Sequence, residues 1–237
     1  MSKAYKGKTC AYCAEPEGST TGDHVFAREF FPETRRANLP KVPACEPCNR
    51  TKSELEHYLT AVLPFAGRHD DASEVLNSMV PGRLAKNHKL HRELAASQSH
   101  AWVKRAGMIA PAMTLHLDAS QLEGLVRYIV RGLVQYHWNV VVPADYAVGV
   151  GIWTDEGERL ITSVMPFNGK AVAQESWGAG AFEYRGVQAT DDPFLSVWRL
   201  SMYGGAVLGG DAEQGHEVSP RIWAMTSREP AEELFRY

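Results

Sequence analysis

The chain has 237 residues, of which 44% are hydrophobic and 22% are charged, and its net charge at pH 7 is -3. This composition is ordinary for a globular protein with one large domain or two unequal ones, and it excludes a polybasic tail as a nucleic-acid anchor. No stretch approaches the ~20 consecutive apolar residues of a membrane span, and no apolar run follows the first lysines. We therefore expect a cytoplasmic protein that has neither a secretory signal nor a membrane contact.

The cysteines of the chain are confined to its first fifty residues and form two C-x-x-C pairs, Cys10 with Cys13 and Cys45 with Cys48. In a chain of this length without a secretory signal, such pairs indicate one tetrahedral zinc site. Residues 14–44 separate the pairs, a longer gap than the ~15 to 20 residues of a simple zinc ribbon. The gap therefore holds an inserted segment.

The inserted segment contains an acid next to a histidine, Asp23 and His24, at the start of the stretch DHVFAREFF. Its β-prone and aromatic residues predict a strand that leads into a turn or a short helical piece. Three prolines in residues 32–43 then predict a loop, because proline lacks the N–H donor and restricts the residue before it. After Cys48, the apolar spacing of residues 49–63 predicts a helix.

The rest of the chain predicts helices followed by strands. Residues 65–118 are expected to be helical and polar, with Asp71 as a helix cap. Residues 119–137 have the strongest helical pattern, with His137 as a core residue on the apolar face. Beyond Pro143, short β-branched or aromatic segments predict a small antiparallel sheet: residues 146–153, 158–165, 180–188, 194–203 and 221–225. The expected fold class is α+β.

The order C-x2-C, Asp-His, Asn, C-x2-C-N-x2-K resembles the zinc-stapled form of the HNH endonuclease family. The resemblance covers residues 8–60, and Asn49 stands where many members have a second histidine, as in the H-N-N variants. It implies a ββα-metal nuclease module at residues 1–64 with a structural zinc. The α+β domain that follows, residues 65–237, is then expected to serve recognition or regulation, with a helical part at 65–140 and a β-rich part at 141–237.

The chemistry of phosphodiester hydrolysis gives these residue types their roles. His24 suits a general base because imidazole titrates near neutrality. Asp23 and Asn49 offer hard oxygen ligands to Mg²⁺, for which Mn²⁺ can substitute. Adjacent strand side chains point to opposite faces, so Asp23 and His24 share one site only if the backbone bends there. The family resemblance implies that Asn38 orders the loop and orients His24.

The resemblance implies a DNA substrate, in double-stranded form, and a role in bacterial defence or in phage and mobile-element biology. Arg28, Arg50 and Lys52 are candidate phosphate contacts, although exposed basic residues on short helices commonly just face water. Two alternatives remain open: a noncatalytic zinc-dependent module that binds nucleic acid or protein, and a nuclease that acts on RNA. The sequence also leaves open a homodimer.

Overall fold

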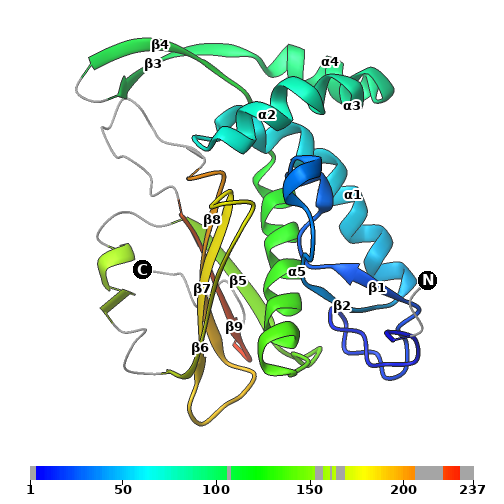
Figure 1. The fold of residues 1–237 in the computed structure, drawn as a ribbon. Coiled ribbons are helices and arrows are strands. Elements are labelled where there is room, and N and C mark those ends of the chain that lie inside the picture. Colours follow the sequence, from blue (N-terminus) through cyan, green and yellow to red (C-terminus); the bar gives the residue numbers. More distant parts are fainter. Residues whose placement is uncertain are drawn as a thin grey trace.

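The long helix α5 (Ala119–Trp138) lies between the N-terminal part of the chain and a five-stranded sheet (Figure 1). The computed structural model describes residues 4–105, 108–152, 157–160, 162–163, 169–205 and 221–229. Mixed helix and sheet agree with the predicted α+β class. Within the described residues, no helix is both long enough and apolar enough to cross a membrane.

The N-terminal part contains a two-stranded antiparallel ribbon followed by a helix. Strand β1 (Thr21–His24) pairs with β2 (Lys41–Ala44), and α1 (Glu46–Val62) follows directly. The prediction of a continuous loop over residues 32–43 is therefore wrong at its end. Pro43 is tolerated because both strands of a two-stranded ribbon are edge strands, in which some backbone positions donate no hydrogen bond to the partner strand. The carbonyl of Pro43 accepts a hydrogen bond from the backbone N–H of Ala11 at 2.9 Å.

Short helices connect these elements to the middle of the chain. Two 3-10 turns, η1 (Arg28–Phe30) and η2 (Glu33–Arg35), lie between β1 and β2. After α1 come the elements η3 (Leu63–Ala66), α2 (Asp70–Ser78), α3 (Val80–Lys86) and α4 (His88–Ser97).

The prediction that Asp71 caps α2 is wrong, because the capping residue is His69. Its Nδ1 accepts a hydrogen bond from the backbone N–H of Asp71 at 3.1 Å. The carboxylate of Asp71 is instead fully buried and forms an ion pair with Arg35. The acid therefore anchors the loop between β1 and β2 to helix α2, a long-range contact that spacing along the chain does not reveal.

A β-hairpin interrupts the segment that we expected to be helical. Strand β3 (Ser99–Arg105) pairs with β4 (Met108–Thr114). Two of its large apolar side chains, Trp102 and Ile109, are 68% and 70% exposed. A strand is predicted from an alternation in which the apolar side chains are the buried ones, and these two positions do not follow it.

The sheet beyond α5 is antiparallel throughout, with strand order β5-β9-β8-β7-β6. Its strands are β5 (Ala147–Ile152), β6 (Gly169–Trp177), β7 (Phe182–Ala189), β8 (Ser196–Met202) and β9 (Arg221–Ser227). The predicted strand at residues 158–165 is wrong, since residues 157–160 and 162–163 are helical. Strand β6 was not predicted.

One continuous buried cluster joins the N-terminal part to α5 and the sheet. Tyr12 packs edge-on against Tyr128 of α5 at a ring-centroid distance of 5.1 Å. On the side of the sheet, His137 lies within hydrogen-bonding distance of the Tyr184 hydroxyl at 2.9 Å, as expected for a satisfied core residue. The predicted boundary at residue 64 therefore divides the sequence, but residues on both sides of it share one hydrophobic core.

Candidate functional site

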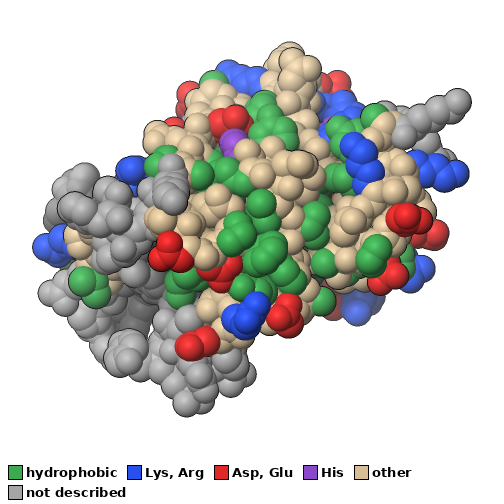
Figure 2. All heavy atoms as spheres, turned by 90° about the horizontal axis from the view of Figure 1, so that it is seen from below, with side chains coloured by type: hydrophobic (Ala, Val, Ile, Leu, Met, Phe, Trp, Pro, Cys, Tyr) green, Lys and Arg blue, Asp and Glu red, His purple; other side chains and the backbone are tan. Residues whose placement is uncertain are grey.

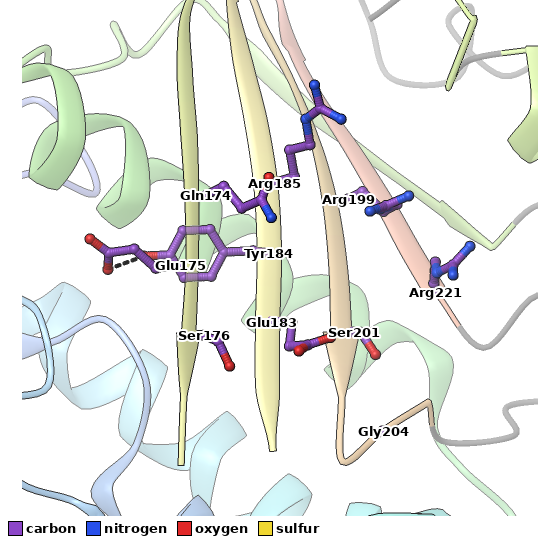
Figure 3. A pocket seen from close by; sticks show the side chains of 10 residues that line it. All are labelled: Gln174, Glu175, Ser176, Glu183, Tyr184, Arg185, Arg199, Ser201, Gly204 and Arg221. Atoms are coloured by element: carbon purple, nitrogen blue, oxygen red, sulfur yellow. Dashed lines mark hydrogen bonds between the residues drawn. The ribbon is translucent and has the colours of Figure 1, made fainter. Parts of the chain in front are cut away.

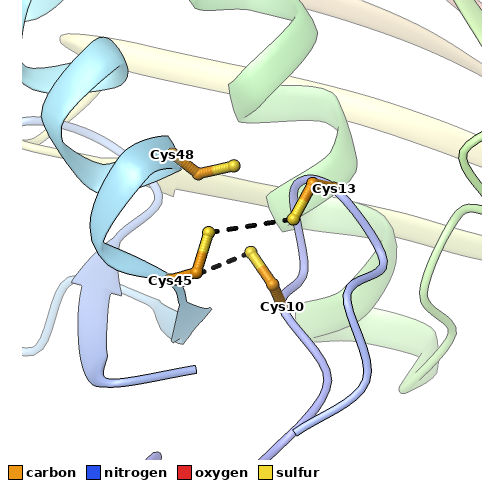
Figure 4. Close-up of side chains that lie close together, drawn as sticks. All are labelled: Cys10, Cys13, Cys45 and Cys48. Atoms are coloured by element: carbon orange, nitrogen blue, oxygen red, sulfur yellow. Dashed lines mark hydrogen bonds between the residues drawn. The ribbon is translucent and has the colours of Figure 1, made fainter. Parts of the chain in front are cut away.

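The four cysteines converge at the start of α1 (Figure 4). Cys10 and Cys13 lie on a tight turn, Cys45 is the N-cap of α1 and Cys48 lies in its first turn. All four Sγ atoms lie within 4.8 Å of one another, and all four thiols are free of disulfides. They form a cluster that can hold a metal ion such as zinc.

One separation between the sulfur atoms matches that of a tetrahedral zinc site. Zn–S bonds of about 2.3 Å at tetrahedral angles place neighbouring sulfurs about 3.8 Å apart. The Sγ atoms of Cys13 and Cys45 are 3.7 Å apart. The backbone N–H of Cys45 also donates to Cys10 Sγ at 3.4 Å. Burial alone raises the pKa of the Cys10 thiol, but backbone N–H groups of Cys45, Cys13 and Tyr12 outweigh it and lower that pKa. Burial raises the pKa of the Cys13 and Cys48 thiols in the metal-free cluster. Zinc binding therefore has to release their protons, because a thiolate is the form that binds zinc.

Lys52 ties α1 to the end of β1. Its side chain is fully buried, and its ammonium donates to the carbonyl oxygen of His24 at 2.7 Å. The same ammonium lies 3.0 Å from Asp23 Oδ2 and forms an ion pair with Glu56. Lys52 therefore has an internal role, and in this arrangement it does not face solvent as the predicted phosphate contact would.

Asp23 is held by two neighbours through one of its oxygens. The Tyr12 hydroxyl donates to Asp23 Oδ2 at 2.6 Å, and Lys52 pairs with the same atom. Among the described residues, Asp23 Oδ1 makes no hydrogen bond. Burial, followed by the charge of Asp23, raises the pKa of Tyr12 well above its ordinary value, so the phenol stays a donor. These contacts fix the carboxylate and leave one hard oxygen available to a cation.

His24 is a half-buried imidazole at the end of β1. Desolvation, followed by the charge of Lys41, lowers the pKa of His24 to about 4, although Asp23 acts in the opposite direction. At neutral pH the ring is therefore uncharged and carries a lone pair that can accept a proton, but it is a weaker base than the near-neutral imidazole on which the sequence prediction relied. His24 and Asp23 are neighbours on one strand, and their cross-strand partners Lys41 and Val42 follow without a register shift. The ribbon therefore does not show the bend that would bring both side chains into one site, and Asp23 is turned towards Tyr12 and Lys52.

The two asparagines occupy different positions relative to this pair. Asn49 is partly exposed in the first turns of α1, three residues before Lys52, so the two share a helix face. Because Lys52 contacts Asp23, that face is turned towards β1. Asn38 is exposed in the turn before β2, with a left-handed φ of 57°. Among the described residues its side chain makes no hydrogen bond to His24, so its observed contribution is to the turn.

Arg28 and Arg50 are exposed, as a contact with phosphate requires. Arg28 begins the 3-10 turn after β1, and Arg50 lies in the first half of α1. Both remain predicted substrate contacts.

Two residues of this site were missed in the sequence, Tyr12 and Glu56. Glu56 lines a pocket of about 470 Å³ between α1 and α3, with Glu29, His57 and Arg83. Burial raises the pKa of Glu56 to about 7, although the ion pair with Lys52 acts against that shift. The only available indication was the i,i+4 spacing of Lys52 and Glu56, which is common on helix surfaces.

Comparison with family models, with curated protein sequences and with solved structures finds no match for this chain. The resemblance to HNH endonucleases therefore rests on the residue types and their order in the sequence.

Proposed function

We propose that the protein is a Mg²⁺-dependent endonuclease that hydrolyses phosphodiester bonds of double-stranded DNA. The observation that carries the proposal is the double contact of Lys52 with His24 and Asp23. It fixes the helix that carries Asn49 against the strand end that carries the acid and the histidine. A strand pair followed by a helix, with a four-cysteine cluster at their junction, is also the element order that the HNH resemblance implies.

The donor set suits a hard divalent cation. Asp23 Oδ1 supplies an anionic oxygen and the Asn49 amide a neutral one, which leaves the remaining positions of a magnesium shell to water and phosphate. The bound ion would act as a Lewis acid towards the scissile phosphate. Tyr12 and Lys52 hold the other oxygen of Asp23 in place, so the carboxylate is oriented before the ion binds.

His24 is the proposed general base. A ring nitrogen of the neutral imidazole takes the proton from the attacking water, and the nearby phosphate charge favours the imidazolium that forms. Arg28 and Arg50, which are exposed, are the proposed contacts to flanking phosphates. On the face in Figure 2, basic and acidic side chains are interspersed around a hydrophobic centre.

The zinc is proposed to be structural. Four thiolate ligands complete a tetrahedral shell and leave no open position for a substrate. The cluster joins the turn at Cys10 and Cys13 to the first turn of α1, and so it sets the position of Asn49, the residue that follows Cys48. Residues 65–237 are proposed to serve target choice or control.

A second candidate is a noncatalytic zinc-dependent module that binds nucleic acid or protein. It is favoured by one observation: Asp23 is already satisfied through Oδ2 by Tyr12 and Lys52, as in a purely structural network. Incubation of the full chain with plasmid DNA and RNA in Mg²⁺, Mn²⁺ or EDTA separates the candidates. The nuclease proposal predicts nicked or linear plasmid with either metal ion and intact plasmid in EDTA. Intact plasmid under all conditions favours the binding module.

A further inference from the structure

The face of the five-stranded sheet that points away from α5 carries a row of polar side chains across three strands. Gln174 of β6 is directly opposite Arg185 of β7, and Arg185 is directly opposite Arg199 of β8. Figure 3 shows these side chains on neighbouring strands, with Arg221 of β9 beyond them. The inward-facing neighbours, such as Tyr184 and Leu200, are buried against the core.

The pairing of Arg185 with Arg199 opposes folding. Like charges directly opposite each other on adjacent strands are destabilising. Burial, followed by the charge of Arg185, lowers the pKa of Arg199, and Glu183 counters only part of this effect. Among the described residues, neither guanidinium forms an ion pair. Arg185 Nε is also buried with no hydrogen-bond partner among them, and an unsatisfied buried donor is destabilising.

The surroundings of the two arginines form an open pocket of about 510 Å³. Gln174, Ser176 and Ser201 add neutral hydrogen-bonding groups to its lining, and Arg221 adds a third guanidinium. Arg221 is held by Glu158 from the helical segment at residues 157–160. Arg199 and Arg221 also line the adjoining hollow, together with Arg159. The carboxylates of Glu175 and Glu183 also line the pocket. Among the described residues, the four guanidinium groups around the two hollows therefore outnumber the three carboxylates of Glu158, Glu175 and Glu183 by one. The cavity has the size of small-molecule sites.

We propose that this pocket on the outer face of the sheet binds the phosphate group of a nucleotide or of a polynucleotide, with Arg185 and Arg199 as its main ligands. Guanidinium groups form paired N–H···O bonds with phosphate oxygens, which a single ammonium cannot do. A bound phosphate offsets the repulsion between the two arginines. The site uses no residue of the N-terminal module and does not depend on the proposed cleavage.

The test is calorimetric titration of the full chain with orthophosphate, a nucleoside triphosphate, and single- and double-stranded oligonucleotides, without divalent metal. The variants are Arg199→Gln, Arg185→Gln and Arg199→Lys, and the matched control is Arg92→Gln on the exposed side of α4. We expect saturable binding of at least one probe, weakened at least tenfold by each pocket variant and unchanged by the control. Arg199→Lys keeps the charge and the aliphatic stem, so it remains informative if Arg199→Gln does not fold.

The probes distinguish the two sources of the phosphate. Binding of orthophosphate or nucleotide assigns a free ligand, and binding of oligonucleotide alone assigns the polynucleotide backbone. The proposal is overturned if none of the probes binds saturably, or if folded pocket variants bind as tightly as the parent. Because binding is read without metal, a failure here leaves the cleavage proposal untouched, and loss of cleavage leaves this site untouched.

Discussion

Lys52 and Asp23 form an ion pair of 3.0 Å in which the lysine side chain is fully excluded from solvent. The lysine also reaches the backbone carbonyl of His24, so one buried cation connects a helix to a strand and to the acid at its end. Removing one partner of a buried pair leaves the other charge unpaired, which typically costs about 3–5 kcal/mol.

Lys52→Met should therefore destabilise the protein by several kcal/mol, because Asp23 and Glu56 lose their shared cation. The measurement is the free energy of unfolding from urea denaturation. The control is Lys89→Met, which removes an exposed i,i+4 partner of Glu93 and should change stability by less than about 0.5 kcal/mol. Equal stability of the two variants would contradict the buried network.

One zinc ion per chain is expected, bound by Cys10, Cys13, Cys45 and Cys48. Cys45→Ser should abolish it and lower the denaturation midpoint, because the metal contributes folding free energy directly. Since Tyr12 packs on Tyr128 of α5, the loss should extend beyond the N-terminal part. Elemental analysis and denaturation check both points, and zinc-free folded protein or a disulfide among these thiols would refute the site.

The raised pKa of Glu56 predicts that the protein loses stability as pH rises from about 4.5 to about 7. Its carboxyl has a pKa of about 7 in the folded protein against 4.5 as its ordinary value, so the folded state retains a proton that the unfolded state releases. The contribution of Glu56 to the free energy of unfolding is complete below pH 4.5 and declines by about 3 kcal/mol between about pH 4.5 and about pH 7. Glu56→Gln should flatten the slope, whereas Glu54→Gln, at an exposed position, should preserve it. The measurement is the free energy of unfolding from urea denaturation at a series of pH values. Identical slopes of this free energy against pH in the parent and in Glu56→Gln would exclude Glu56 as the source of the pH dependence.

Gly186 lies under the ring of Trp198, and a Cβ there would clash with the indole carbons. Gly186→Ala should destabilise the sheet by about 1–3 kcal/mol through overpacking. Gly82→Ala is the control, because a Cβ at that position in α3 meets no atom within 4 Å and alanine favours a helix by up to about 1 kcal/mol. The midpoint of thermal unfolding should therefore fall in Gly186→Ala and rise in Gly82→Ala. A stabilising Gly186→Ala would mean that the indole packs elsewhere.

The sequence predicted those parts of the site that local chemistry encodes. Two C-x-x-C pairs indicated a four-thiol metal cluster, and the described thiols do converge. The antiparallel sheet and helix α5 followed from periodicity. The burial of Lys52 did not, because a charged side chain is buried only when distant partners such as Asp23 satisfy it.

The errors in secondary structure have a similar origin. Residues 158–165 contain a β-prone composition, yet their described part is helical. Pro43 was assigned to a loop, although an edge position in a short ribbon accommodates it. In both segments, tertiary context decided the conformation, and local propensity is only a weak guide against it.

In the proposed mechanism, His24 activates water while Asp23 and Asn49 hold a metal ion. The most direct test of this mechanism is the rate of plasmid cleavage against Mg²⁺ concentration for the parent, His24→Ala and Asn49→Ala, with His88→Ala on exposed α4 as control. We predict that His24→Ala lowers the rate about 10²- to 10⁴-fold at unchanged Mg²⁺ dependence. Asn49→Ala should instead raise the Mg²⁺ concentration for half-maximal cleavage. Cleavage by His24→Ala at the parental rate, with zinc content unchanged, would contradict the account.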